Sequence, residues 1–325
     1  MERVNPDHIR QEMNRLGKAG RPFLFAVNFE LTQGFIIPDP LDQEEVFFEI
    51  HGQGNKKPSG PLPPNPVLEV SPLTLEEYTP RFQTVMAGLK RGDSYLVNLT
   101  VATPINRALG MEAIFGASAA PYQLYVPEDF VCFSPERFVL IQNGRISSCP
   151  MKGTINAAIP GAAEIILNDF KETAEHATIV DLLRNDLSLS AKEVRVSRYR
   201  YIEKIKTKQR EILQVSSEIT GVLGQDYRAR LGDIIFKTLP AGSCSGAPKE
   251  STLRIIRRAE KGPRGYYTGV FGVFDGETLD SGVLIRFIEK VDGQFFFRSG
   301  GGITAYSDLK SEWREVLEKI YLPFV

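Results

Sequence analysis

Short apolar segments separated by turn-forming residues recur along the chain, and most of them predict β-strands. A few longer segments place apolar residues at helical spacing. Two hairpin dipeptides, Asp275-Gly276 and Asp292-Gly293, separate the last strands. The predicted strands are residues 23–27, 34–37, 45–51, 95–101, 123–126, 129–134, 138–142, 145–150, 212–223, 270–275, 279–291 and 294–298, and the predicted helices are 5–18, 74–91, 161–185, 247–260 and 309–320. Strand groups with helices between them indicate an α+β fold with antiparallel sheet.

Residues 52–66 are dense in glycine and proline, which predicts an exposed, flexible loop. We expect this loop to close a short N-terminal portion, residues 1–70, that contributes strands. The main domain then covers residues 71–325.

Composition narrows the class of protein. The chain has 325 residues, of which 42% are hydrophobic, so it can bury a sizeable core. The net charge of −1 gives no basic field for nucleic acid. Three cysteines without a CxxC motif favour a reducing compartment, and no apolar run is long enough for a membrane helix or a signal peptide. We therefore expect a cytoplasmic protein.

Two pairs of glutamates have a spacing of three on predicted helices: Glu172 with Glu175, and Glu312 with Glu315. This spacing places both carboxylates of a pair on one helix face. Four converging carboxylates would suit Mg²⁺, which prefers oxygen ligands. On spacing alone, a solvated helix face is the more common explanation for such a pair.

Two glycine-containing segments, residues 299–304 and 240–249, could bring backbone amides close to an anion. Neither matches a nucleotide-binding motif, and a tight turn with a helix cap would explain each one alone. Arg286 lies within an apolar segment that is predicted to be a strand. A buried guanidinium there needs a partner such as a substrate carboxylate, whereas an exposed one needs none.

Together these segments resemble the chorismate-utilising enzymes, which include anthranilate, aminodeoxychorismate, isochorismate and salicylate synthases. The matching motifs are residues 92–99, 134–138, 150–154, 171–186, 240–249, 264–269, 285–286 and 300–303, followed by Glu312 and Glu315. The resemblance implies two antiparallel sheets packed face to face with helices outside, and residues 71–325 as a chorismate-binding catalytic domain.

The resemblance also implies a set of site residues. Mg²⁺ would hold the ring carboxylate of chorismate, with Glu175 and Glu315 as inner ligands and Glu172 and Glu312 acting mostly through water. The expected substrate-binding residues are Thr154, His176, Ser245, Tyr267, Arg286, Gly300, Gly301 and Gly302.

Two positions distinguish the branches of this family. Isochorismate and salicylate synthases resemble one another in carrying a lysine base where this chain has Leu96. Anthranilate synthases usually read PIAGT and aminodeoxychorismate synthases PIKGT, and this chain has Lys152 in PMKGT. The resemblance is therefore to aminodeoxychorismate synthase component I, which aminates chorismate at C4. Lys152 would act as covalent nucleophile, for which burial should lower its pKa, and Glu136 as general acid and base.

Several expectations concern partners and alternatives. The chain contains no glutaminase domain, so ammonia would come from a separate glutamine amidotransferase subunit. The product would feed 4-aminobenzoate and folate synthesis. The alternatives are anthranilate synthase component I, which aminates at C2, and a non-catalytic chorismate-binding subunit. Gln214 stands where the family usually has histidine. The leucine-leucine-glutamate-serine stretch that larger family members associate with tryptophan is not found in the sequence, which weighs against feedback by tryptophan.

Overall fold

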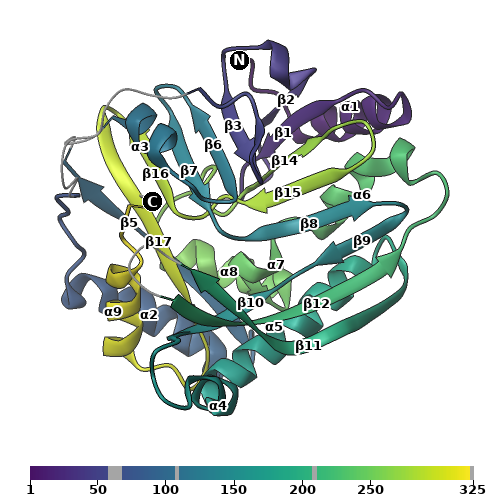
Figure 1. The fold of residues 1–325 in the computed structure, drawn as a ribbon. Coiled ribbons are helices and arrows are strands. Elements are labelled where there is room, and N and C mark those ends of the chain that lie inside the picture. The colour runs from purple at the N-terminus through teal and green to yellow at the C-terminus, as the bar shows by residue number, and fades with distance from the viewer. Residues whose placement is uncertain (58–67, 107–109, 207–210, 323–325) are drawn as a thin grey trace.

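The computed structural model describes residues 1–57, 68–106, 110–206 and 211–322, and within them two antiparallel sheets form the body of the molecule (Figure 1). The first sheet runs in the order β10 (Met151–Asn156), β12 (Glu211–Val222), β9 (Arg145–Ser148), β8 (Arg137–Gln142), β15 (Leu279–Val283), β14 (Val270–Phe274), β1 (Phe23–Val27) and β2 (Gly34–Pro38), with β11 (Lys192–Lys206) paired to β12. The second runs β13 (Gly246–Ala247), β5 (Leu96–Ile105), β17 (Gln294–Ile303), β16 (Phe287–Val291), β7 (Phe130–Ser134), β6 (Tyr122–Val126), β3 (Phe47–Ile50) and β4 (Gln53–Gly54).

An apolar core joins the facing surfaces of the two sheets. It includes Leu24 and Phe271 from the first sheet and Leu124, Phe130 and Phe287 from the second, all buried. Alternating apolar residues on strands of both sheets therefore meet in one layer, as in other face-to-face sheet packings.

Helices cover the outer surfaces of both sheets. Residues of α1 (Pro6–Lys18), α5 (Phe170–Ser188) and α6 (Leu231–Thr238) share a core with the first sheet. Those of α2 (Leu75–Lys90), α8 (Lys249–Ala259) and α9 (Leu309–Glu318) share one with β5 of the second. The remaining helices are α3 (Met111–Ala117), α4 (Ala162–Asn168) and α7 (Gly242–Ser245), with 3₁₀ turns at Pro40–Asp42 and Tyr227–Arg230. This arrangement confirms the predicted fold class.

The first 70 residues contribute strands to both sheets. β1 pairs with β14 in the first sheet, and β3 pairs with β6 in the second. Of the glycine- and proline-rich segment, Gln53–Gly54 form β4, and residues 58–66 lie outside the described part of the chain. The boundary at residue 70 stays a prediction.

Polar caps determine where the helices begin. Asn5 accepts hydrogen bonds from the amides of Asp7 and His8 at the start of α1, and Thr74 forms a capping box with Glu77 at the start of α2. Asp169 explains why the predicted helix 161–185 is wrong. Its extended backbone ends α4, and its carboxylate accepts from the amide of Glu172 at 2.8 Å to begin α5.

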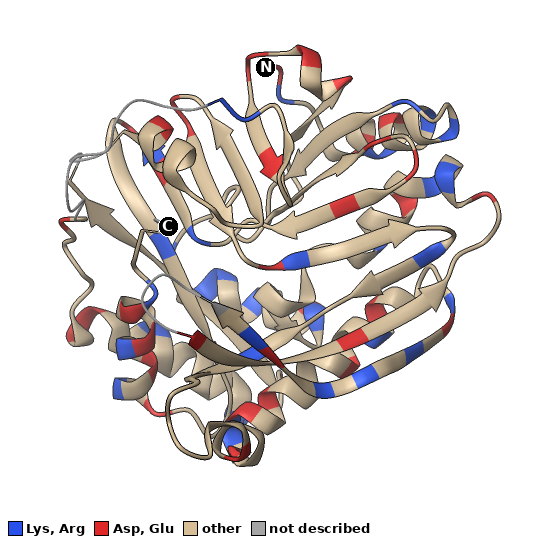
Figure 2. Cartoon of the chain, in the orientation of Figure 1, with Lys and Arg blue, Asp and Glu red and all other residues tan. Residues whose placement is uncertain are grey.

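The structure corrects the sequence predictions at several other places. Segment 279–291 is two strands, β15 and β16, separated by Leu284, Ile285 and Arg286. The glycines at 300–302 belong to β17, where they pair with β5, and do not form a loop after it. The predicted elements also do not include α3, α6, β10 and β11. The last of these carries basic residues along its length (Figure 2), which hid its strand pattern.

No helix in the described part of the chain is long and apolar enough to cross a membrane.

Candidate functional site

Lys152 lies at the centre of the candidate site. It belongs to β10, whose register with β12 shifts between Lys152 and Thr154. Gly153 occupies this bulge with φ of +78°, a conformation that favours glycine. A Cβ at Gly153 would lie 3.3 Å from Oε2 of Glu172, so the glycine also lets α5 approach the strand closely.

The ammonium of Lys152 forms an ion pair with α5, its Nζ 2.5 Å from Oε2 of Glu175. Burial pulls the pKa of Lys152 down, but the carboxylates of Glu175 and Glu172 push it up by more, so the net shift is upward. The expectation of a lowered pKa is therefore wrong, because the sequence did not reveal how close the glutamates lie to Lys152.

The two glutamate pairs converge on this region from α5 and α9. Glu175 and Glu312 are each 1% exposed, and burial raises the pKa of Glu172 and of Glu312. Three of the buried carboxylate oxygens have no hydrogen-bond partner: Glu172 Oε2, Glu175 Oε1 and Glu312 Oε2. Buried polar atoms are rarely left without partners, and unpaired ones often mark the place of an ion or ligand.

Two further lysines lie in the same cluster, and the sequence interpretation missed both. Lys171 Nζ donates to Glu312 Oε1 at 2.7 Å and lies 3.7 Å from Glu175 Oε1, so it bridges the two helices. Lys319 Nζ donates to Glu315 Oε1 at 2.7 Å and to the carbonyl of Gly300 at 2.8 Å. A lysine four residues from a glutamate on a helix usually forms a surface pair, so the spacing of Lys171 and Lys319 contains little signal of a site.

The glycines of β17 bring the sheet close to the charged cluster. A Cβ at Gly301 would lie 3.2 Å from Glu315 Oε1, and one at Gly302 would lie 3.4 Å from Glu175 Oε2 and 3.5 Å from Lys152 Nζ. Larger side chains would fill the space between strand and acids. The same Cβ on Gly302 would lie 3.1 Å from Cδ1 of Leu96, so an apolar side chain stands where the resemblance would place a lysine or glutamine.

The oxygen atoms of the cluster are of the kind that binds a divalent cation, but their positions in the structure are not those of a metal site. The buried, unpartnered oxygens are the ligands that Mg²⁺ prefers. Yet no group of three His, Cys, Asp or Glu residues in the described ranges is arranged to hold a metal ion. The carboxylates of Glu175 and Glu312 are instead directed at lysine ammonium groups.

Glu136, in the connection from β7 to β8, lies beside the cluster. Burial raises the pKa of its carboxyl group, while the nearby charges of Arg286, Lys152 and Lys319 lower it by less. Ser243 of α7 donates to Glu136 Oε1 at 2.5 Å. The sequence interpretation named Ser245 in this turn, but the hydroxyl that contacts Glu136 is that of Ser243.

Arg286 lies between β15 and β16 with φ of +53°, and is therefore neither buried in a strand nor exposed on one. Its Nε donates to the hydroxyl of Tyr321 at 3.0 Å, and the guanidinium lies 5.1 Å from the centroid of that ring. Tyr267 is buried and packs against Phe287 of β16. Burial raises the pKa of Tyr267, and the positive charges of Arg264 and Arg286 oppose the rise.

Other predicted substrate-binding residues have different surroundings. His176 is buried, its Nε2 lies 2.7 Å from Ser217 Oγ, and burial lowers its pKa to about 4, so it is neutral. The hydroxyl of Ser245 donates to the carbonyl of Ala241 at 3.0 Å. Thr154 is exposed on β10, opposite Gln214 of β12.

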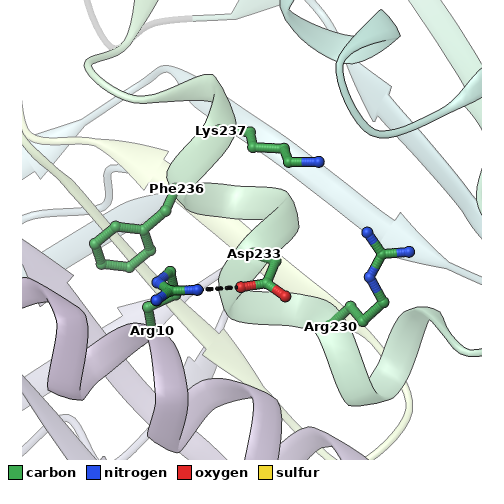
Figure 3. A pocket seen from close by; sticks show the side chains of 5 residues that line it. All are labelled: Arg10, Arg230, Asp233, Phe236 and Lys237. Atoms are coloured by element: carbon green, nitrogen blue, oxygen red, sulfur yellow. Dashed lines mark hydrogen bonds and ion pairs between the residues drawn. The ribbon is translucent and has the colours of Figure 1, made fainter.

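A separate hollow lies outside the candidate site, between α1 and α6 (Figure 3). Arg10, Arg230, Asp233, Phe236 and Lys237 line it, and Arg10 pairs with Asp233 at 2.7 Å. None of these residues belongs to the charged cluster around Lys152.

The sequence of this chain is similar to a known family and to several named proteins. The family model described as chorismate binding enzyme matches residues 38–323. A PabA-like protein of Haemophilus influenzae is 48% identical over 325 residues, which cover 99% of this chain and 98% of that protein. An aminodeoxychorismate synthase component 1 of Bacillus subtilis is 30% identical over 77% of this chain and 55% of its own length.

The chain is also similar to an anthranilate synthase component and to the solved structure of an isochorismate synthase. An anthranilate synthase component 1 of Haloarcula marismortui is 33% identical over 77% of this chain and 53% of its own length. The solved structure of an isochorismate synthase of Bacillus anthracis aligns with a TM-score of 0.72, covers 98% of this chain and 89% of its own, and is 19% identical. That last likeness concerns the fold alone. Because the family model matches most of the sequence, this chain belongs to the chorismate-binding enzymes.

Proposed function

We propose that this enzyme aminates chorismate at C4, giving 4-amino-4-deoxychorismate, as aminodeoxychorismate synthase component I does. The observation that carries the proposal is the position of Lys152, whose amine lies among the two glutamate pairs and beside the glycines of β17. A lysine at the centre of the proposed chorismate site could attack the ring as a nucleophile. An enzyme that adds ammonia directly at C2 does not require such a nucleophile.

The proposed chemistry has two displacements. The amine of Lys152 adds at C2 of the ring, the two conjugated ring double bonds shift from C1=C2 and C5=C6 to C1=C6 and C4=C5, and the C4 hydroxyl leaves as water after Glu136 protonates it. Ammonia then adds at C4, both double bonds shift back to C1=C2 and C5=C6, and the C2–N bond to Lys152 breaks. The net change replaces hydroxyl by amine at C4 and releases one water. Before attack, the ion pair between Lys152 and Glu175 must open and the ammonium must lose a proton.

Several groups support recognition of the two substrate carboxylates. Arg286 can present its terminal nitrogens to one of them, because Tyr321 engages only Nε. The carbonyl of Gly300 accepts from Lys319, and in an antiparallel strand the amide and carbonyl of one residue point to the same edge. We therefore expect the amides of Gly300 and Gly302 to point away from β5, where they could bind an anion.

Magnesium belongs to the same proposal. Glu175 and Glu315 would be inner ligands, and Glu172 and Glu312 would act mostly through water, which accounts for the unpartnered oxygens in both pairs. When bound, Mg²⁺ supplies positive charge that fixes the ring carboxylate and offsets its charge. The chain's own lysines provide that charge in the arrangement described above.

A second candidate activity is C2 amination with loss of pyruvate, as in anthranilate synthase component I. The raised pKa of Lys152 favours it, because a permanently protonated lysine would serve as a counter-charge for Glu175 and could not attack the ring. In that case ammonia would add directly at C2.

Product analysis decides between the two activities. Purified protein is incubated with chorismate, ammonium and Mg²⁺, and products are identified by mass. We expect 4-amino-4-deoxychorismate, with no pyruvate released. Anthranilate with an equal amount of pyruvate would replace the first proposal by the second. Absence of any turnover would favour a non-catalytic chorismate-binding subunit.

The source of ammonia is a further part of the proposal. We expect ammonium salts to support turnover by this chain alone, and glutamine to support it only after a glutamine amidotransferase subunit is added. Turnover with glutamine in the absence of any other protein would contradict this division of labour.

A further inference from the structure

Lys171 is the side chain that joins the two acidic helices. It stands next to Glu172 in the first turn of α5, yet its ammonium reaches across to Glu312 of α9 at 2.7 Å. The same nitrogen lies 3.7 Å from Glu175 Oε1. Within the described residues, Lys171 is thus shared between one glutamate of each pair.

Glu312 is poorly placed to remain charged without Lys171, whereas Glu175 also has the ammonium of Lys152 as a counter-charge. Glu175 and Glu312 are each 1% exposed, whereas the side chain of Lys171 is 32% exposed. A buried carboxylate without a counter-charge is costly, so a neighbouring cation is required. The second oxygen of Glu312 and the Oε1 of Glu175 still lack hydrogen bonds, which leaves ligand capacity unused in both groups.

A divalent cation that used these oxygens would compete with Lys171 for the same carboxylates. Both the ammonium and Mg²⁺ neutralise the acids, and like charges a few ångströms apart repel each other. The carboxylates of Glu312 and Glu175 cannot point fully at both.

We propose that Lys171 is a positioning residue and a built-in substitute for the metal: its ammonium holds α5 and α9 together in the metal-free protein and weakens Mg²⁺ binding by competing for Glu175 and Glu312. The proposal relies on the proposed function only for the identity of the cation. It requires no substrate, so its test is separate from the identity of the reaction.

The test compares variants of the whole chain without chorismate. Lys171→Gln keeps a hydrogen-bond donor and removes the charge, Lys171→Met removes both, and Lys171→Arg retains both. The exposed Lys310 of α9 supplies the control, because Lys310→Gln makes the same charge change without touching Glu175 or Glu312. Mg²⁺ affinity is measured by calorimetry, and the melting temperature is measured with EDTA and with saturating Mg²⁺.

We expect Lys171→Gln and Lys171→Met to bind Mg²⁺ about tenfold more tightly than the unmodified protein, since one opposing charge beside the ion is gone. Both should melt at a lower temperature in EDTA and recover most of that loss with Mg²⁺. Lys171→Arg and Lys310→Gln should match the unmodified protein in both measurements. Unchanged or weaker Mg²⁺ binding in Lys171→Gln would overturn the proposal. So would tighter binding with no loss of melting temperature in EDTA, or failure of the unmodified protein to bind Mg²⁺.

Discussion

The ammonium of Lys152 on β10 and the carboxylate of Glu175 on α5 form an ion pair with 2.5 Å between Nζ and Oε2. The pair joins the proposed nucleophile to a proposed metal ligand. Its formation depends on the β10 bulge, which lets α5 approach, and on Gly302, which leaves room beside both groups. Lys152 therefore neutralises Glu175 in the structure, and attack on the ring is a separable task that the proposed function assigns to it.

Two substitutions of Lys152 separate these tasks. Lys152→Ala removes the amine and leaves Glu175 without that counter-charge, whereas Lys152→Arg retains a cation that cannot act as a nucleophile at neutral pH. We expect both variants to lose C4 amination while still binding chorismate, and Lys152→Arg to keep the thermal stability of the unmodified protein. Product analysis and chorismate binding by fluorescence check this. Substantial C4 amination by Lys152→Arg would rule out the covalent role.

The pH dependence of turnover should reflect Glu136. Burial raises its pKa, so the carboxyl group stays protonated to a higher pH than an exposed glutamate, and a general acid must be protonated to act. Turnover should therefore fall as pH rises through that pKa. The hydrogen bond from Ser243 lowers the pKa, so Ser243→Ala should move the fall to higher pH.

Rate profiles of turnover against pH test this relation. Glu136→Gln should lower turnover by about 10²- to 10⁴-fold, the usual range for loss of a general acid. Ser243→Cys serves as a comparison, because it is similar in size but a weaker donor. A profile for Ser243→Ala that moves to lower pH, or does not move, would show that Glu136 is not the titrating acid.

The α+β class with antiparallel sheet could be predicted because its strands and helices show their burial in the sequence, whereas the packing of two sheets face to face was implied by the family resemblance. The core residues Leu24, Phe130 and Phe271 lie in apolar segments bounded by turns, and caps such as Asn5 and Thr74 mark the helix starts. β11 was missed because its basic residues conceal the alternation of a half-exposed strand. The sequence predicts a loop at Gly300 to Gly302, because glycine triplets favour loops unless a close neighbour requires them, but these residues form part of β17.

For the candidate site, the sequence could indicate which residues to consider but not which contacts they make. The motifs indicated Lys152, Glu136 and the glutamate pairs, but spacing along a helix does not reveal which groups from other elements lie opposite. The ion pairs of Lys171 and Lys319 with the acids, and the contact of Ser243 with Glu136, depend on packing between segments far apart in sequence. The raised pKa of Lys152 has the same origin, because its cause lies on α5.

Tyr321 should contribute to substrate affinity through Arg286. Its hydroxyl accepts from Nε and so holds the terminal nitrogens in one orientation. Tyr321→Phe should raise KM for chorismate roughly three- to tenfold, the effect expected of one hydrogen bond, with kcat little changed. Tyr306→Phe is the control, because Tyr306 is exposed on the connection from β17 to α9. A fall in kcat without a change in KM would contradict a positioning role.

The stability of the second sheet's helical layer should depend on Arg264, which is 1% exposed. Its guanidinium pairs with Glu260 at 2.6 Å and also donates to the carbonyls of Cys244 and Asn98. Glu260→Ala would leave a buried cation without its carboxylate. We expect the free energy of unfolding to fall by about 3–5 kcal/mol, the usual cost of breaking a buried ion pair from one side.

A pair within α8 itself provides a matched control for that measurement. Glu250 also pairs with an arginine four residues later, Arg254 at 2.9 Å, but its side chain is 93% exposed. Exposed pairs contribute little because water screens them, so Glu250→Ala should change the free energy of unfolding by less than about 1 kcal/mol. Urea denaturation of both variants measures the difference. Equal losses would mean that burial of the Arg264 pair adds nothing, and the helical layer would then depend on its apolar contacts alone.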